Sequence, residues 1–196
     1  MAARHILPGG GYTLVELLLA ISTIAAVAGL AVPIASGTVD DLRAAGAARL
    51  MAARIATIRL DAVRRAATVS LRFEPRGADY AFTTFLDGNG NGVRTADIAA
   101  GVDKPIAAAD LLRSHFPGVT FGLRPGVPDL DGGLTSTDGV RIGSTPFLSS
   151  APNGSCTSGT LYLHGRRRQY AIRILGATGR VRLFAFENGA RRWIQK

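Results

Sequence analysis

The sequence predicts an α+β fold in which one long N-terminal helix packs on an antiparallel β-sheet. Two observations predict it. Residues 14–66 are rich in helix formers, with apolar residues at three- and four-residue steps, and after Ala67 short stretches alternate apolar with polar residues. The chain of 196 residues suits one domain with an appendage, and its 24 glycines favour many turns over a plain helical bundle.

The first part of the predicted helix is apolar. From Leu14 to Ala35 the run is interrupted only by the polar residues Glu16, Ser22 and Thr23. At about 1.5 Å per residue it is long enough to cross a hydrocarbon core of about 30 Å, so we expect residues 12–35 to form a transmembrane helix. A secretory signal peptide is cleaved after its apolar stretch. Here the candidate cleavage point, after Gly11, precedes that stretch, so the helix would stay on the mature chain.

The second part of the predicted helix, residues 36–67, is amphipathic. Its apolar stripe consists of Val39, Leu42, Ala45, Ala53, Ala56, Leu60 and Val63. We expect this stripe to pack on the globular head, with most arginines on the other faces. Pro33, between the two parts, predicts a bend in the helix.

The head, residues 68–196, is predicted to be rich in β-strands. The expected strands are Thr68–Phe73, Tyr80–Leu86, Val119–Leu123, Val140–Ile142, Thr160–His164, Tyr170–Leu175 and Arg180–Phe186. Turns that contain glycine separate the last three, which predicts an antiparallel meander. The glycine- and proline-rich residues 124–158 are predicted to form a loop.

Positive charge is concentrated at the C-terminal end of the chain. The formal net charge is +9; residues 1–155 hold 14 basic and 13 acidic side chains, whereas residues 156–196 hold nine basic side chains against Glu187 alone. This asymmetry indicates an anionic partner, namely nucleic acid, lipid headgroups or an acidic protein face. The alternative is a solvated arginine-rich surface.

Several functional classes are disfavoured by the residues present. The only cysteine, Cys156, excludes an intrachain disulfide and a thiolate metal cluster, and the three histidines lack metal-ligand spacing. The sequence contains no nucleophile elbow, phosphate-binding loop or Ser-His-Asp constellation. We therefore expect a protein that is not an enzyme.

The segment Gly11-Tyr12-Thr13-Leu14-Val15-Glu16 resembles the type III signal of type IV pilins and type II secretion pseudopilins. The resemblance implies that residues 1–11 are a leader, and that a prepilin peptidase cleaves between Gly11 and Tyr12 and methylates Tyr12. It places Glu16 at the family's glutamate, the fifth mature residue, and Pro33 at the family's kink. Tyr12 replaces the usual phenylalanine, which is a mild departure.

A carboxylate near the start of a membrane helix is costly unless it has a partner. The new amine on Tyr12 of a neighbouring subunit would be a natural partner for Glu16, which gives this glutamate a role in assembly. The alternative is an interfacial glutamate that the helix dipole favours.

The rest of the chain resembles the GspH/FimT branch of this class. The residues that carry this resemblance are Ala53-Arg54, Ala56, Arg59, Val69-Ser70-Leu71, Phe147, Gly154, Gly159-Thr160-Leu161 and Ala177-Thr178-Gly179-Arg180-Val181-Arg182. It implies a pilin-like fold and a minor pseudopilin, a structural subunit of the type II secretion pseudopilus that takes part in protein secretion across the outer membrane. Residues 87–145 fall outside the resemblance and are expected to be an insertion.

The resemblance also implies a location and a set of partners. It implies a single-pass protein of the bacterial inner membrane with a periplasmic C-terminal domain. The implied partners are other pseudopilins or pilins, the prepilin peptidase, the inner-membrane assembly platform and inner-membrane lipid.

An alternative function involves the C-terminal arginines. Gly179-Arg180-Val181-Arg182 is similar to a Gly-Arg-x-Arg element of FimT-like type IV minor pilins, which is associated with DNA binding in natural transformation. Alternate strand residues share a face, and guanidinium groups suit phosphate oxygens. We expect a second cluster to approach this element in a hairpin: Arg166, Arg167 and Arg168. The same element also occurs in secretion pseudopilins that need not bind DNA.

Residues 87–92, Asp-Gly-Asn-Gly-Asn-Gly, have the D-x-N-x-N-G form of a calcium loop. The candidate ligands are Asp87, Asn89, Asn91 and Asp97. The twelfth position holds Ile98 instead of glutamate, and Asp97 or Asp103 would have to substitute, so the expected affinity is weak, about 10⁻⁴–10⁻³ M. The alternative is a tight turn between strands. Calcium is the one candidate cofactor.

Overall fold

The computed structural model describes the backbone of residues 11–133 and 136–196, and the side chains of these residues apart from 29–36. The chain forms two compact units, Met1–Val39 and Asp40–Lys196. The long helix α1 (Leu14–Arg65) contributes to both units.

In the first unit, α1 exposes its large apolar side chains. Leu14 is 75% exposed, Val27 is 67% exposed, and the large apolar residues between them are all more than half exposed. No helix in the described part of the chain is both long and apolar enough to cross a membrane. The predicted span over residues 12–35 lies partly outside the residues whose side chains are described. Pro33 falls within the bounds of α1, but its side chain lies outside the described residues, so the predicted bend stays a prediction.

The second unit contains two antiparallel sheets. The first has the strand order β3 (Lys104–Pro105), β2 (Asp79–Leu86), β1 (Val69–Arg76) and β7 (Phe147–Ser150), with β4 (Asp110–Leu111) also paired with β2. The second has the order β11 (Arg192–Gln195), β10 (Arg180–Glu187), β9 (Gln169–Leu175), β8 (Gly159–His164) and β5 (Thr120–Phe121), with β6 (Val140–Ile142) also paired with β8. Two short helices, α2 (Thr95–Ala99) and α3 (Leu112–His115), complete a mixed α+β structure.

The strand predictions hold for all seven expected strands, within a few residues at their ends. Strands β8, β9 and β10 form the predicted antiparallel meander. The expected loop over residues 124–158 is wrong at β7, whose four residues pair with β1. Because that partner lies more than 70 residues earlier in the chain, no local pattern marks β7 as a strand.

The buried face of α1 in the second unit is not the predicted one. The core side chains of this part of α1 are Ala44, Ala47, Ala48, Met51, Ile55, Ile58 and Ala62. The predicted stripe instead faces solvent over most of its length: Leu60 is 64% and Val63 52% exposed, and Leu42, Ala53 and Ala56 are exposed as well. Both faces have helical spacing. The face rich in alanine is the one that packs, because small side chains let the helix backbone approach the large side chains of the sheets.

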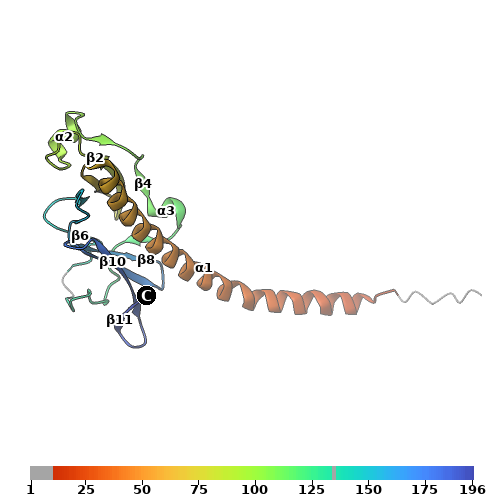
Figure 1. Ribbon diagram of the computed structural model, residues 1–196. Coiled ribbons are helices and arrows are strands. Elements are labelled where there is room, and N and C mark those ends of the chain that lie inside the picture. The colour runs from red at the N-terminus through yellow and green to blue at the C-terminus, as the bar shows by residue number, and fades with distance from the viewer. Residues whose placement is uncertain (1–10, 134–135) are drawn as a thin grey trace, which may run out of the picture. The chain divides into compact units, whose positions relative to one another are not determined.

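The two faces of the second sheet have different surroundings. Its inner face contributes Leu161, Leu163, Ile172 and Ile174 to the same core as α1. On its outer face Tyr162, Ala171, Phe184 and Trp193 pack against Leu123, Val127 and Leu130. Figure 1 shows β6, β8 and β10 close to one another on one side of the second-unit part of α1. The outer face presents the polar groups described next.

Candidate functional site

The predicted processing and assembly residues lie at the start of α1. Gly11 has open space around its Cα, and Tyr12 is 91% exposed. Thr13 donates hydrogen bonds to Glu16 Oε2 from its N–H and its Oγ1, both at 3.0 Å, and the Glu16 N–H donates to Thr13 Oγ1 at 3.2 Å. This reciprocal arrangement is a capping box, which satisfies free N–H groups at a helix start. The Thr-x-x-Glu spacing is typical of this motif, which adds a capping role to the charge pairing and the helix-dipole interaction expected for Glu16.

A row of polar side chains crosses the outer face of the second sheet. The strand registers place Arg141 opposite Thr160, Thr160 opposite Arg173, and Arg173 opposite Arg182. Cross-strand partners point to the same face of a sheet. The row therefore gathers three guanidinium groups and one hydroxyl from β6, β8, β9 and β10.

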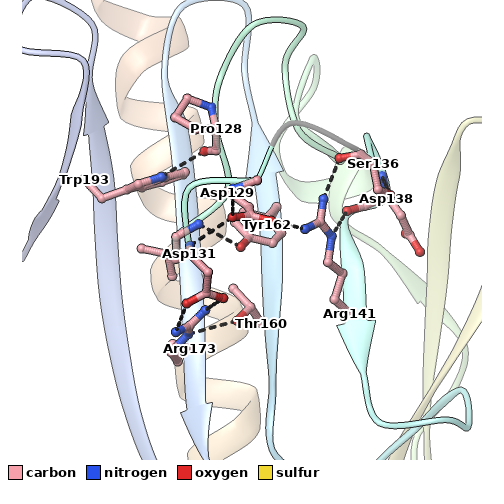
Figure 2. Close-up of polar contacts among 12 residues, drawn as sticks. Pro128, Asp129, Asp131, Ser136, Asp138, Arg141, Thr160, Tyr162, Arg173 and Trp193 are labelled. Atoms are coloured by element: carbon pink, nitrogen blue, oxygen red, sulfur yellow. Dashed lines mark hydrogen bonds and ion pairs between the residues drawn. The ribbon is translucent and has the colours of Figure 1, made fainter.

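Two of these arginines are paired with carboxylates from one loop. We call residues 126–133 the acidic loop, after Asp129 and Asp131. Figure 2 shows Asp131 facing Arg173, whose Nη1 and Nη2 donate to its two carboxylate oxygens at 2.8 and 2.6 Å. Arg173 Nε also donates to Thr160 Oγ1 at 3.1 Å, so this guanidinium binds both Asp131 and Thr160.

Arg141 holds the same loop at a second point. Its Nη1 donates to Asp129 Oδ2 at 2.8 Å, and its guanidinium carbon lies 5.0 Å from the ring centre of Tyr162, within cation–π range. It also donates to the carbonyl oxygens of Ser136 and Asp138, as Figure 2 shows. Arg141 therefore joins the acidic loop to the strand beneath it.

Two uncharged hydrogen bonds complete the attachment of the acidic loop. The Leu130 N–H donates to the Tyr162 hydroxyl at 3.1 Å, and Trp193 Nε1 donates to the Pro128 carbonyl at 3.0 Å. The rings of Tyr162 and Trp193 lie 6.0 Å apart, centre to centre. The loop thus covers the aromatic part of the outer face and leaves the arginine row beside it.

The pairing changes the acidity of both carboxylates. The hydrogen bond from Arg173 holds the pKa of Asp131 below its usual value, and the same bond raises the pKa of Arg173. Burial by itself would raise the pKa of Asp129. The N–H groups of Gly133 and Asp131 and the Arg141 guanidinium outweigh burial, and the pKa of Asp129 lies below its usual value. Both acids therefore stay ionised at neutral pH.

The predicted DNA-binding arginines do not come together. Arg166, Arg167 and Arg168 lie in the turn between β8 and β9, whereas Gly179 and Arg180 lie at the turn between β9 and β10. The two turns are at opposite ends of β9, about 20 Å apart at roughly 3.3 Å per residue. The expectation that they approach each other in a hairpin is wrong, because consecutive turns of a meander alternate between its ends.

The two arginine groups also differ in their partners. Arg168 Nε donates to Asp41 Oδ2 of α1 at 3.0 Å, and the Arg166 N–H donates to Asp40 Oδ2 at 2.9 Å. Arg180 and Arg182 are exposed, and their side chains have no hydrogen bond or ion pair with any residue of ranges 11–133 and 136–196. Among the described residues, Arg168 is ion-paired, whereas the guanidinium groups of Arg166, Arg167, Arg180 and Arg182 have no hydrogen-bond or ion-pair partner.

Three residues of the GspH/FimT resemblance meet near the end of α1. Arg59 Nε donates to the Gly154 carbonyl at 3.0 Å. Gly179 has a φ of 61°, and a Cβ at this position would lie 2.7 Å from both Arg59 Nε and the Gly154 oxygen. The close approach and the positive φ together explain why glycine precedes Arg180.

The candidate calcium loop forms a turn that is closed by two buried carboxylates. Asp87 accepts N–H donors from Asn89, Gly90 and Gly92 at 2.7–3.1 Å. Burial by itself would raise the pKa of Asp87, but these donors hold it below its usual value. Asp103, 1% exposed, accepts from the N–H groups flanking the same turn.

Two of the other candidate calcium ligands, Asn91 and Asp97, have different surroundings. Asn91 is exposed, and the backbone carbonyl of Asp97 accepts N–H groups while its Oδ2 is buried without a hydrogen-bond partner. The residues that the structure describes contain no group of three acidic, histidine or cysteine side chains placed to hold a metal ion. Calcium binding stays a prediction.

The residues of the most connected polar site were not among those predicted from the sequence; they are Asp129, Asp131, Arg141 and Arg173. The available signal was weak: two aspartates one residue apart in a proline- and glycine-containing turn, with single arginines in two later strands. Comparisons of the chain with protein-family models, curated proteins and solved structures found no match.

Proposed function

We propose that this chain is a minor pseudopilin, a structural subunit of a type II secretion pseudopilus with a pilin-like fold. In this proposal residues 12–35 are embedded in the bacterial inner membrane before assembly, and the head lies in the periplasm. The observation that carries it is the six-residue segment Gly11–Glu16 placed directly before an apolar helix. The mixed α+β head, with helix packed on antiparallel sheet, is compatible with this role.

The exposed apolar surface of the first unit supports an assembly role. Its large exposed side chains are Leu14, Val15, Leu17, Leu18, Leu19, Ile21, Ile24 and Val27. Burying each such side chain fully is worth about 1.5–3 kcal/mol, and contiguous apolar surface of this kind marks an interaction site. In this proposal lipid before assembly, and neighbouring helices after it, would cover these exposed side chains.

Glu16 has a free oxygen for an intersubunit contact. Oε2 is occupied by Thr13, whereas Oε1 accepts no hydrogen bond from any residue that the structure describes. In the proposal this oxygen pairs with the amine that cleavage after Gly11 creates on a neighbour's Tyr12. Pairing lowers the cost of placing both charges in an apolar bundle.

The capping box gives this proposal a sharp test. Glutamine at position 16 can keep the two hydrogen bonds that Thr13 donates to the side chain but has no charge. Alanine removes these two bonds and keeps only the one from its own N–H to Thr13 Oγ1. The chain would be co-expressed with a prepilin peptidase and its partner pseudopilins. Mass spectrometry would read the mature N-terminus, and crosslinking would read incorporation into filaments. We expect a methylated Tyr12 N-terminus and loss of incorporation in both Glu16→Gln and Glu16→Ala.

The matched control for this experiment is Glu187→Gln, which removes an exposed acid of the head. It should be incorporated as well as the unmodified chain. A mature protein that begins at Met1 would contradict the proposal. Incorporation of Glu16→Gln at the normal level would show that Glu16 acts only as a helix cap.

One observation favours a second candidate function, a FimT-like type IV minor pilin that binds DNA. Arg180 and Arg182 are exposed, unpaired within the described residues and on one face of β10. Electrophoretic mobility shifts of the full chain at several salt concentrations would test it. DNA binding through these groups should weaken steeply as salt rises and weaken further in Arg182→Gln. No shift at low salt would eliminate this candidate.

A further inference from the structure

A groove in the second unit lies between the last turns of α1 and the turn from β9 to β10. It has a volume of about 530 Å³, and its lining residues are Ala56, Arg59, Leu60, Val63, Arg64, Gly179, Arg180 and Val181. This volume lies within the range of about 300–1,000 Å³ that is usual for binding pockets. The lining of the groove includes neither Glu16 nor any residue of the arginine row on the outer face. Its Arg180 lies two residues before Arg182 on β10.

The floor of the groove is apolar. Leu60 and Val63 belong to the helix face that the core leaves uncovered, at 64% and 52% exposure. Ala56 is exposed on the same face, and Val181, partly buried, closes the opposite wall against the core. A ligand that covered this floor would therefore bury leucine and valine side chains that nothing else in the second unit covers.

The rim of the groove is cationic. Arg180 has no side-chain partner among the described residues, and Arg59 uses only Nε, which donates to Gly154, so its terminal nitrogens stay free. Arg64 is 80% exposed and lies 3.9 Å from Asp61, its nearest acid, which is not among the lining residues. The lining of the groove therefore combines three arginines with apolar side chains and contains no carboxylate.

We infer that this groove binds a short acidic and apolar peptide segment of a partner protein. The guanidinium groups would bind its carboxylates, and the floor formed by Leu60 and Val63 would bind its apolar side chains. This inference stands on the groove alone and does not need the proposed role in secretion. It gives the exposed helix face and the unpaired Arg180 one common ligand.

A peptide fits this groove better than nucleic acid does. Proteins that bind single strands without sequence preference combine basic grooves with aromatic side chains on which bases stack. The lining has no aromatic residue, and its floor is aliphatic. A phosphate backbone would use the rim and leave the floor uncovered, so the two ligand classes differ in their dependence on Leu60.

The test uses the full chain in phosphatidylcholine nanodiscs, which are zwitterionic, and fluorescence anisotropy of three labelled heptapeptides. The first alternates leucine with glutamate, the second leucine with lysine, and the third serine with glutamate. We expect only the leucine–glutamate peptide to bind. Its affinity should fall about tenfold in Arg180→Gln, which loses a charge-assisted contact, and by a similar factor in Leu60→Ser. Both sites are exposed, so both variants should fold.

The matched control is Arg192→Gln, an exposed arginine of β11 outside the groove, which should leave binding unchanged. Circular dichroism would confirm that each variant is folded. Equal binding of the lysine or serine peptide, or unchanged affinity in both groove variants, would overturn the inference. A thymidine oligonucleotide that binds and is weakened by Arg180→Gln but not by Leu60→Ser would overturn it in favour of a nucleic-acid surface. None of these readouts depends on cleavage after Gly11.

Discussion

Helix α1 has opposite packing properties in the two units of this protein. Between Leu14 and Val27 its large apolar side chains are all more than half exposed. Between Ala44 and Ala62 its buried face is mostly alanine, with Met51 and two isoleucines, and the sheets cover it completely. The part with more apolar surface is therefore the part whose large apolar side chains are exposed among the described residues.

Hydrophobicity alone therefore does not identify the face of α1 that packs inside the chain. In the second unit small residues face the core, because the sheets provide the bulk and small residues let the backbone approach them. Leu60 and Val63, which are larger, stay exposed on the other face. Apolar surface that the chain leaves uncovered is then available for partners, both at the start of α1 and along the groove.

The largest expected effect on stability comes from replacing an apolar side chain on the buried face of α1 by alanine, compared with the same replacement on the exposed face. Ile55, 1% exposed, lies in the core, and Leu60 lies on the exposed face of the same helix. Ile55→Ala should lower the free energy of unfolding by about 2–5 kcal/mol through lost burial and a cavity. Leu60→Ala should change it by less than about 0.5 kcal/mol. Urea unfolding followed by the fluorescence of Trp193 would measure both. Similar losses in the two variants would mean that the assigned faces are wrong.

The same contrast between covered and uncovered groups extends to charged side chains. Arg141 is paired with Asp129 and lies over Tyr162, whereas Arg182, on the same sheet face, is unpaired among the described residues. Arg141→Gln should cost about 1–3 kcal/mol, because it leaves a largely buried carboxylate without its charged donor. Arg182→Gln should cost less than about 0.5 kcal/mol. Equal thermal stability of the two variants would contradict the role of Arg141 as the anchor of the acidic loop.

The smallest expected effect is a change in stability with pH, which depends on the paired carboxylates of the acidic loop. The pKa of Asp129 and that of Asp131 are lowered in the folded chain, so both contribute stability above their unfolded value of about 3.9. That contribution is lost as the pH falls below about 4 through the folded pKa values. Because Trp193 donates to Pro128 of the same loop, its fluorescence should change in this window. Asp129→Asn should weaken the change, and an unaltered titration would exclude Asp129 as its source.

Much of the fold could be predicted from local sequence patterns. Alternation located all seven expected strands, since a strand with one buried face shows its period of two along the chain. The missed elements, such as β7 and β11, are four residues long and exist because a distant or neighbouring strand pairs with them. The buried face of α1 was mispredicted because two faces share the helical period. Only contact with the sheets distinguishes Ile55 from Leu60.

Residue types and their spacing are enough to establish the helix-then-strand order, the position of the Gly11–Glu16 motif and the excess of arginine at the C-terminal end. Which arginines are available for a partner depends on tertiary contacts. Arg141 and Arg173 are neutralised by Asp129 and Asp131, and Arg182 is not. An ion pair depends on which side chains the strand registers and the acidic loop bring within about 3 Å. Asp129 and Arg141 are 12 positions apart and Asp131 and Arg173 are 42 apart, so no local pattern in the sequence shows these contacts.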